Sequence, residues 1–294
     1  MTLLTFNTLS IENLENREEV NDLLIQLAYG ITKFLSYKEY RGSRFYFEEK
    51  NIFNLEIIEG YKFRDALISI KPEIARTLHL FMKQQCNSDC LNKMSDEEIE
   101  NIIDSDLYFD DEPYNAQKYL ILSYSLDKKT FLLSFGKDRW INYKIIANKV
   151  KEDGSSKKVI LDNIANKEHV IAHYNQKQLD KLPTENIIYS DNFKNWFLLQ
   201  DNSSIDKIVS KIGEAEKINF DIDGFLVKSI HQNIWQIKIG TQGGLQQSAI
   251  RVLFIKNDSK IYILHGFVKQ GGSTYDYTND ISIATEIYKR TNEI

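Results

Sequence analysis

The chain has 294 residues, of which 42% are hydrophobic, and only 3 are proline and 13 glycine, so its size and composition predict two packed domains rather than a disordered protein. No run of about 18 apolar residues is present, and no basic region precedes the apolar residues of MTLLTFNTLS, so we expect neither a membrane helix nor a signal peptide and predict a cytoplasmic protein. The formal net charge of −5 argues against nucleic-acid binding by the molecule as a whole.

The N-terminal part begins with a mixture of helix and strand patterns. Asn16 can cap a helix whose apolar residues recur at helical spacing. The segment from Phe45 to Ile58 is rich in aromatic and β-branched residues and predicts one or two strands. Pro72 lies at the first turn of a second helix, and Ser95 with Glu98 forms a capping-box pattern for a third.

Further along, Lys118–Leu126 and Thr130–Phe135 flank a short polar turn and predict a hairpin. Another strand is expected over Tyr143–Val150. Pro183 marks the expected domain boundary. The sequence therefore predicts an α+β domain over residues 1–183 and a second domain over residues 184–294.

The second domain has a simpler order of elements. A strand enters a helix within Asn186–Gln200, and an amphipathic helix follows over Ile205–Ile218. The remaining patterns predict four strands and a final helix, over Phe225–Ser229, Ile234–Ile239, Ala249–Ile255, Lys260–Val268 and Asp280–Arg290.

Positive charge is concentrated in the predicted strands. Between Gly224 and Tyr275 the only acidic residue is Asp258, whereas six residues are cationic: Lys228, Lys238, Arg251, Lys256, Lys260 and Lys269. Residues 1–185 hold 25 cations and 30 acids, and residues 186–294 hold 12 of each. The strands thus form a local basic patch in an acidic protein, and such a patch attracts a phosphate backbone.

Four motifs of this part occur in a recognisable order: NIWQIKIG (Asn233–Gly240), AIRVLFI (Ala249–Ile255), IYILHGFVK (Ile261–Lys269) and DISIATEIYKR (Asp280–Arg290). Over about residues 186–294 the chain resembles the RelE/ParE toxin superfamily, in particular its HigB-like branch. The resemblance implies a RelE-like domain with two helices, an antiparallel meander sheet and a C-terminal helix. The N-terminal part is similar to uncharacterised bacterial proteins encoded near defence and plasmid genes, which implies no chemistry.

The resemblance implies a toxin-like endoribonuclease. Domains of this type cut RNA, including ribosome-bound mRNA, by attack of the substrate's own 2′-hydroxyl, so no metal and no other cofactor is expected. RNA or the ribosome and an antitoxin protein are the implied partners, in a toxin–antitoxin or phage-defence setting. Two alternatives stay open: a catalytically degenerate module that binds RNA, the ribosome or a protein, and a ParE-like inhibitor of DNA gyrase.

Three residues are candidates for the catalytic groups. Arg251 carries a planar guanidinium that suits two-point contact with a phosphate. His265 is a candidate because a histidine side chain can serve as general acid or base near neutral pH. Lys269 matches the first lysine of the family's lysine pair, whereas Gln270 replaces the second. That replacement puts full activity in question.

Four further residues are candidates for RNA binding. Lys228 and Lys238 add cations to the sheet, and Lys238 stands where the family has arginine. Gln236 stands where the family has glutamate, which removes a carboxylate. Tyr275 and Tyr277 could stack on a base or could cover the start of the last helix.

Metal-binding patterns are weak. Cys86 and Cys90 have no second cysteine pair with which to complete a zinc site. His169 and His173 would share a helix face, but Glu168 lies outside the pair, so the HExxH pattern is absent. We therefore expect no metal.

Charge also suggests a role for the N-terminal domain. Residues 1–185, with a net charge of −5, precede a sheet with a local excess of positive charge in the same chain. A covalently attached partner acts at high effective concentration, so even a weak interface could hold the site closed. We therefore predict that residues 1–183 act as a sensor or restraint.

Overall fold

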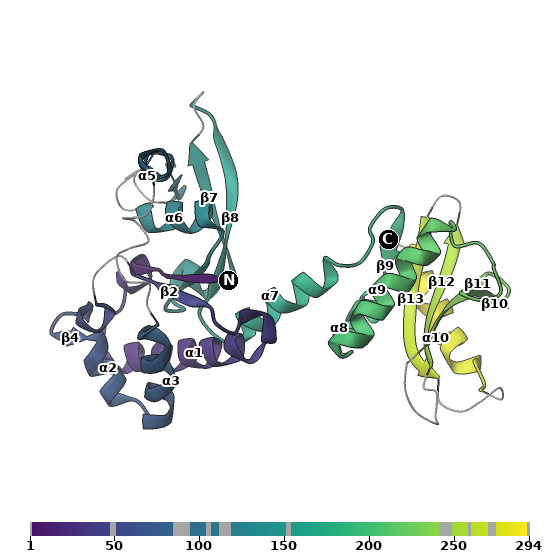
Figure 1. Cartoon of the computed structure of the whole chain (residues 1–294), viewed down its shortest axis with the longest axis horizontal. Helices are drawn as coiled ribbons and strands as arrows, with labels where there is room; N and C mark the ends of the chain where they lie inside the picture. The colour runs from purple at the N-terminus through teal and green to yellow at the C-terminus, as the bar shows by residue number, and fades with distance from the viewer. Residues whose placement is uncertain are drawn as a thin grey trace. The chain divides into compact units, whose positions relative to one another are not determined.

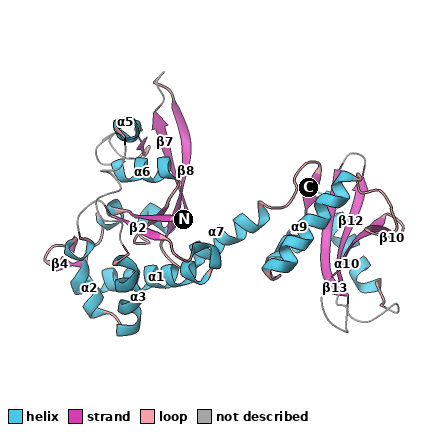
Figure 2. Ribbon diagram, in the orientation of Figure 1, coloured by secondary structure: helices cyan, strands magenta, loops and turns pink. Residues whose placement is uncertain are grey.

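The structure of the chain is a computed structural model that describes residues 2–47, 51–84, 95–103, 107–111, 119–150, 154–240, 249–257, 260–269 and 275–292. The chain divides into two compact units, Met1–Tyr174 and Asn175–Ile294 (Figure 1). Both units combine helices with strands, so the fold class is α+β, as predicted (Figure 2). No helix within the described ranges is long and apolar enough to cross a membrane.

The first unit is built on a six-stranded sheet with the order β2-β1-β6-β8-β7-β5. Its strands are β1 (Leu3–Phe6), β2 (Arg44–Tyr46), β5 (Leu107–Tyr108), β6 (Phe131–Leu133), β7 (Lys144–Val150) and β8 (Ser156–Ile164). β1 is parallel to β2 and β6, and β6 is parallel to β8, whereas β7 is antiparallel to β8 and β5. Parallel strands require both faces to be covered. Accordingly, the adjacent residues Leu132 and Leu133 belong to two different hydrophobic clusters.

Helices cover this sheet. They are α1 (Arg17–Ser36), α2 (Phe63–Ser69), α3 (Pro72–Met82), α5 (Asp96–Ile103), α6 (Leu120–Lys128) and α7 (Lys167–Leu179). Short elements complete the unit: β3 (Glu56–Ile58), β4 (Tyr61–Lys62) and 3-10 turns at Thr8–Ile11, Lys38–Tyr40, Ile52–Asn54 and Asp138–Ile141. The helix predicted after Asn16 is confirmed, because the Asn16 side chain accepts a hydrogen bond from the Glu19 N–H at 2.9 Å. The helix predicted at Pro72 is also confirmed.

The predicted hairpin of Lys118–Leu126 with Thr130–Phe135 is wrong. Residues Leu120–Lys128 form the helix α6, and β6 pairs in parallel with β1 and β8 instead. Five consecutive residues of α6, from Ile121 to Ser125, are buried, so the sequence shows no apolar stripe to reveal the helix. Lys129 ends α6 in the left-handed conformation, with φ 50°.

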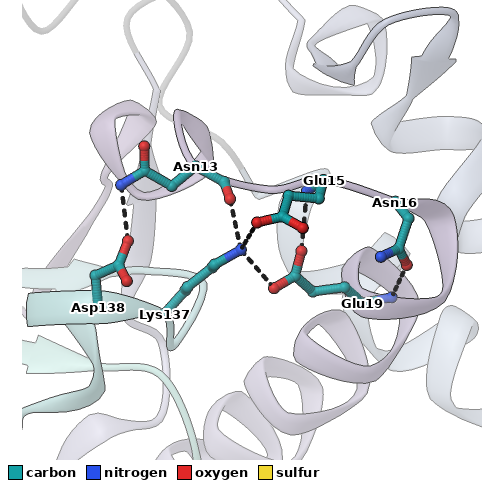
Figure 3. A network of polar contacts seen from close by, with 6 residues as sticks. All are labelled: Asn13, Glu15, Asn16, Glu19, Lys137 and Asp138. Carbon is teal, nitrogen blue, oxygen red and sulfur yellow. Dashed lines mark hydrogen bonds and ion pairs between the residues drawn. The ribbon is translucent and has the colours of Figure 1, made fainter.

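A lysine links two loops of the first unit (Figure 3). Lys137, which follows β6, donates a hydrogen bond from Nζ to the Asn13 carbonyl at 2.6 Å and pairs with Glu19 at 2.7 Å. The Asn13 amide donates to Asp138 at 2.7 Å. The bond from Lys137 is the main reason that the pKa of Glu19 lies below its usual value. These polar contacts thus connect the loop that follows β1 with the loop that follows the neighbouring parallel strand β6.

His169 and His173 share one face of α7, as expected, and both are buried. Nδ1 of His169 and Nε2 of His173 contact the Asn163 carbonyl at 3.2 Å and 3.1 Å, and Nε2 of His169 contacts the Ile141 carbonyl at 2.9 Å. Burial lowers the pKa of both imidazoles. Within the described ranges, no group of three histidine, cysteine or acidic residues could hold a metal ion. Cys86 and Cys90 lie outside those ranges.

The second unit is built on a five-stranded sheet with the order β10-β11-β12-β13-β9. The strands are β9 (Ile187–Tyr189), β10 (Val227–His231), β11 (Ile234–Ile239), β12 (Ala249–Asn257) and β13 (Lys260–Lys269). β10 to β13 form an antiparallel meander, as predicted, and β9 adds a parallel edge strand beside β13. The helices are α8 (Asp191–Leu198), α9 (Asn202–Lys217) and α10 (Thr278–Asn292).

The two faces of this sheet bury different clusters. Ile237, Val252 and Ile263 pack on one face with residues of α8 and α9. Leu253 and Phe267 pack on the other face with residues of α10. The helices therefore lie on both sides of the sheet, and the strand residues alternate between the two cores.

Gly266 of β13 allows α8 to approach the sheet closely. A Cβ atom at this position would lie 2.1 Å from Cε3 of Trp196. That separation is far below any van der Waals contact, so the indole occupies the space that a side chain would need. The glycine of the LHGF motif is thus required by packing.

We expect Gly266→Ala to destabilise the second unit by about 1–3 kcal/mol, as overpacking of a well-filled core does. The matched control is Gly213→Ala in α9, where an added Cβ meets nothing within 4 Å. Because glycine is a poor helix former, that change should raise stability by about 0.5–1 kcal/mol. Scanning calorimetry of the full chain measures both. Equal effects of the two substitutions would contradict the packing role of Gly266.

The histidines of α7 predict a pH dependence for the first unit. An unfolded histidine gains its proton near pH 6.5, whereas His173 in the fold stays neutral to lower pH. The unfolded state therefore binds more protons, and stability should fall as the pH falls from about 6.5 toward the lowered native pKa. His173→Gln should flatten this dependence in calorimetric scans between about pH 7.5 and 5.5. His79→Gln, which removes an exposed imidazole, should leave it as in the wild type.

Candidate functional site

The register of the second sheet brings the predicted site residues to one face. Lys238 lies opposite Arg251, and Arg251 lies opposite Phe267. Side chains that lie opposite each other across antiparallel strands point to the same side of the sheet. Phe267 packs on the side of α10, so Lys238 and Arg251 belong to that side as well.

The neighbouring rows extend this face. Lys228 pairs with Gln236, Gln236 with Leu253, and Leu253 with His265, while Lys269 lies opposite Ala249. These rows are two residues from the row of Arg251 along each strand, so their side chains share its face. We call the set Lys228, Gln236, Lys238, Arg251, His265 and Lys269 the basic face.

Arg251 lies near the centre of the basic face with part of its guanidinium unpaired. One terminal nitrogen donates a hydrogen bond to the Ile250 carbonyl at 2.9 Å, and Nε is buried without a partner among the described residues. Gln236, a diagonal neighbour across the strands, is only 4% exposed, and its Oε1 likewise finds no partner in the described ranges. Buried polar atoms are normally hydrogen-bonded, so both atoms retain an unused capacity for a hydrogen bond among the described residues.

His265 is held between two side chains. Its Nε2 lies 3.1 Å from Oδ1 of Asp280, and its Nδ1 lies 3.0 Å from Oδ1 of Asn192. Asp280 is buried at the first turn of α10, and Tyr275 donates a hydrogen bond to its Oδ2 at 2.9 Å. Each ring nitrogen thus lies within hydrogen-bonding distance of a side-chain oxygen. Nδ1 is on the exposed side of the ring, whereas Nε2 faces the buried carboxylate.

The two tyrosines pack over the end of the sheet. The ring of Phe267 stacks on Tyr275 at 5.6 Å and on His265 at 5.7 Å. Burial, followed by the bond to Asp280, raises the pKa of Tyr275 to about 12, so its hydroxyl donates rather than accepts at neutral pH. Tyr275 thus covers the start of α10. Lys269 lies 5.6 Å from the centroid of the Tyr277 ring, within the range of a cation–π contact.

The two remaining lysines lie toward the β10 edge. Lys238 donates from Nζ to the Gly224 carbonyl at 2.6 Å. Lys228 is exposed, and the described part of the chain offers it no ion pair. Gln270 lies outside the described residues. The basic face therefore has Arg251 and His265 at its centre and Lys228 and Lys238 toward the β10 edge.

Two side chains that contact His265, Asp280 and Asn192, were not predicted as site residues from the sequence. Asp280 was included only as the first residue of the last helix, and an acid at that place is common because it complements the helix dipole. Asn192 was part of a strand-to-helix segment. Asn192 and Asp280 are 73 and 15 residues from His265 in the sequence. No local sequence pattern predicts such contacts.

The match to known families falls on this unit. Residues 195–289 match the family described as Phage derived protein Gp49-like (DUF891), and this range includes Arg251, His265, Lys269 and Asp280. The comparisons with curated proteins and with solved structures found no match. Residues 195–289 thus form a Gp49-like domain, of a family that belongs to the RelE/HigB-like toxin superfamily.

Proposed function

We propose that the second unit is a toxin-type endoribonuclease that cleaves RNA by attack of the 2′-hydroxyl on the adjacent phosphate. The observation that carries the proposal is the basic face: cations of four strands converge on one side, and the buried Nε of Arg251 is unpaired among the described residues. Asp280, the buried acid beside His265, is already engaged by His265 and Tyr275. The face is therefore suited to an anionic ligand.

Each residue has a role in the proposed reaction. Arg251 binds two oxygens of the scissile phosphate and stabilises the charge that builds up on them. As the 2′ oxygen bonds to phosphorus, the bond to the 5′ oxygen breaks. The 2′ proton leaves to water, and His265 donates a proton from Nδ1 to the 5′ oxygen after Asn192 is displaced. Lys269 adds a positive charge beside the phosphate. The products are a 2′,3′-cyclic phosphate and a 5′-hydroxyl.

One observation favours a second candidate, a module that binds RNA without cutting it. Gln236 occupies the place at which the family has glutamate, so no carboxylate can accept the 2′ proton there. The same face would then hold RNA, or ribosome-bound mRNA, through its cations alone. The superfamily also makes an antitoxin partner plausible. The sensor or restraint role of residues 1–183 stays a prediction.

The proposed contact between the Arg251 guanidinium and the scissile phosphate can be tested by substitution. Arg251→Ala should reduce RNA cleavage by about 10² or more, because a donor to the charged transition state is lost. Lys256→Ala is a matched control, since Lys256 lies on the same strand but bonds to Asn219 and Asp221 away from the basic face. Both full-length variants are assayed for 5′-hydroxyl ends on a single-stranded RNA. Cleavage by Arg251→Ala at the wild-type rate would sink the assignment, and binding without cleavage by the wild type would support the second candidate.

The role of Asp280 can be tested separately. Asp280→Asn should reduce cleavage roughly tenfold or more, part of the 10²–10⁴ that general acid–base catalysis supplies. It should also change the shape of the pH profile of kcat/KM between about pH 5 and 8, because Asp280 contacts the proton-donating imidazole. Tyr275→Phe removes the other partner of Asp280 and leaves His265 in place, so its pH profile should keep the wild-type shape. If the two variants lose equal activity with unchanged pH profiles, Asp280 has only a structural role.

A further inference from the structure

An exposed aromatic ring lies just before β10. Phe225 is 89% exposed, the largest such value among the described large hydrophobic residues. Its backbone is nevertheless fixed, because Oδ1 of Asp223 accepts hydrogen bonds from the N–H groups of Phe225, Leu226 and Val227 at 3.0, 2.8 and 2.9 Å. These bonds also hold the pKa of Asp223 below its usual value. The turn therefore presents the ring to solvent from a backbone that is already ordered.

The ring borders an open hollow of about 510 Å³. The lining residues are Lys211, Glu214, Lys217, Ile218, Asp223, Phe225, Leu226 and Lys238. Glu214 pairs with Lys211, and Asp223 is occupied by the backbone of its own turn. Lys217 and Lys238 therefore remain as cations of the hollow that no carboxylate in the described ranges neutralises. Its size is that of a small-ligand site.

The hollow lies at the edge of the sheet against α9, and it shares one residue, Lys238, with the basic face. Lys238 belongs to both, because it lies opposite Arg251 on the sheet and its Nζ bonds to the carbonyl of Gly224, the residue before Phe225. A strand of nucleic acid whose phosphate contacts Arg251 would pass Lys238 and the edge of the sheet before it reached the ring of Phe225. Alternating cations and an exposed ring are what proteins use to hold single-stranded RNA, with phosphates on the cations and a base on the ring.

We propose that Phe225, Lys217 and Lys238 form a subsite for one nucleotide of single-stranded RNA that flanks the position cut at Arg251. The inference rests on the proposed function and names residues that lie beyond the catalytic centre. RNA is favoured over a protein partner for two reasons. The hollow has the size of one ligand rather than of a stable protein interface, which buries more than about 1,000 Å². It also shares the cation Lys238 with the basic face.

The experiment measures RNA affinity by fluorescence anisotropy with the full chain and two labelled probes. Both are 2′-O-methyl oligoribonucleotides, which lack the attacking hydroxyl, one of three nucleotides and one of twelve. Phe225→Ala should weaken binding of the longer probe about tenfold and leave the shorter probe unchanged, because only the longer one reaches the subsite. Phe225→Trp should restore the affinity, since tryptophan also stacks. Ile222→Ala, another exposed apolar residue of the same loop, is the matched control and should bind like the wild type.

The outcomes separate this proposal from the proposed function. Wild-type affinity of Phe225→Ala for the longer probe would overturn the subsite and assign the exposed ring to a protein partner, while RNA binding by the chain would stand. Equal losses of affinity for the two probes would also overturn the subsite, because the substitution would then affect the region around Arg251 that both probes contact. If the wild type binds neither probe and cleaves no unmodified RNA, both the subsite and the endoribonuclease proposal fall.

A kinetic measurement gives an independent readout. With a cleavable substrate of about twelve nucleotides, Phe225→Ala should raise KM with little change in kcat, because the subsite holds substrate and transition state alike. A loss in kcat with unchanged KM would place Phe225 in the chemical step and contradict the proposal. Lys217→Ala should raise KM in the same way, with an effect that shrinks as salt concentration rises.

Discussion

The contact between Trp196 and Gly266 fixes the strand orientation on which the proposed chemistry of the second unit depends. The Trp196 indole of α8 lies against β13 at Gly266, which has no side chain. Position 266 must therefore face the core with α8. Neighbouring strand residues point the opposite way. His265 and Phe267, on either side of Gly266, are therefore directed to the basic face. A slip of one residue would exchange the faces and would place an imidazole against the indole.

A local irregularity in β13 adds to this constraint. The pairing of β12 with β13 shifts between Leu253 and Phe254, where Leu253 lies opposite His265 and Phe254 lies opposite Ile263. Leu264 is therefore the extra residue, and it packs in the core with α10 together with Phe267. Bulges of this kind redirect side chains next to functional sites. Because of the bulge, the first half of β13 contributes side chains to the core with α10. The second half of β13 carries His265 and Lys269.

The centre of the basic face is not arranged for stability alone. Nε of Arg251 and Oε1 of Gln236 are buried without partners in the described part of the chain, although a buried polar atom left unpaired is destabilising by about 1–3 kcal/mol. The buried Asp280 does not pair with the arginine, because its oxygens bond to His265 and Tyr275. A carboxylate paired with Arg251 would satisfy its Nε atom and, in the proposed function, would compete with the phosphate. Local rules of this kind are broken mainly at functional sites.

Patterns that depend on neighbouring residues could be predicted from the sequence, and those that depend on distant contacts could not. Alternation along the strands predicted β11, β12 and β13, and a capping side chain predicted the start of α1. The helix α6 was predicted as a strand because burial on all sides removes its periodicity. The parallel pairing of β9 with β13, and the contact of Asp280 with His265, join segments that share no local pattern.

The face and the hollow would contribute to RNA binding in different ways. Attraction by Lys228, Lys238 and Lys269 comes mainly from the release of condensed counterions, so it weakens as salt concentration rises. Stacking on Phe225 depends on contact between rings and changes little with salt. Near physiological ionic strength the ring would therefore carry a larger share of the affinity than it does in dilute buffer. Because every base offers a flat face, stacking would add affinity without a strong preference for sequence. Any preference for one cleavage site must then arise where the base next to the scissile phosphate meets the side chains around Arg251.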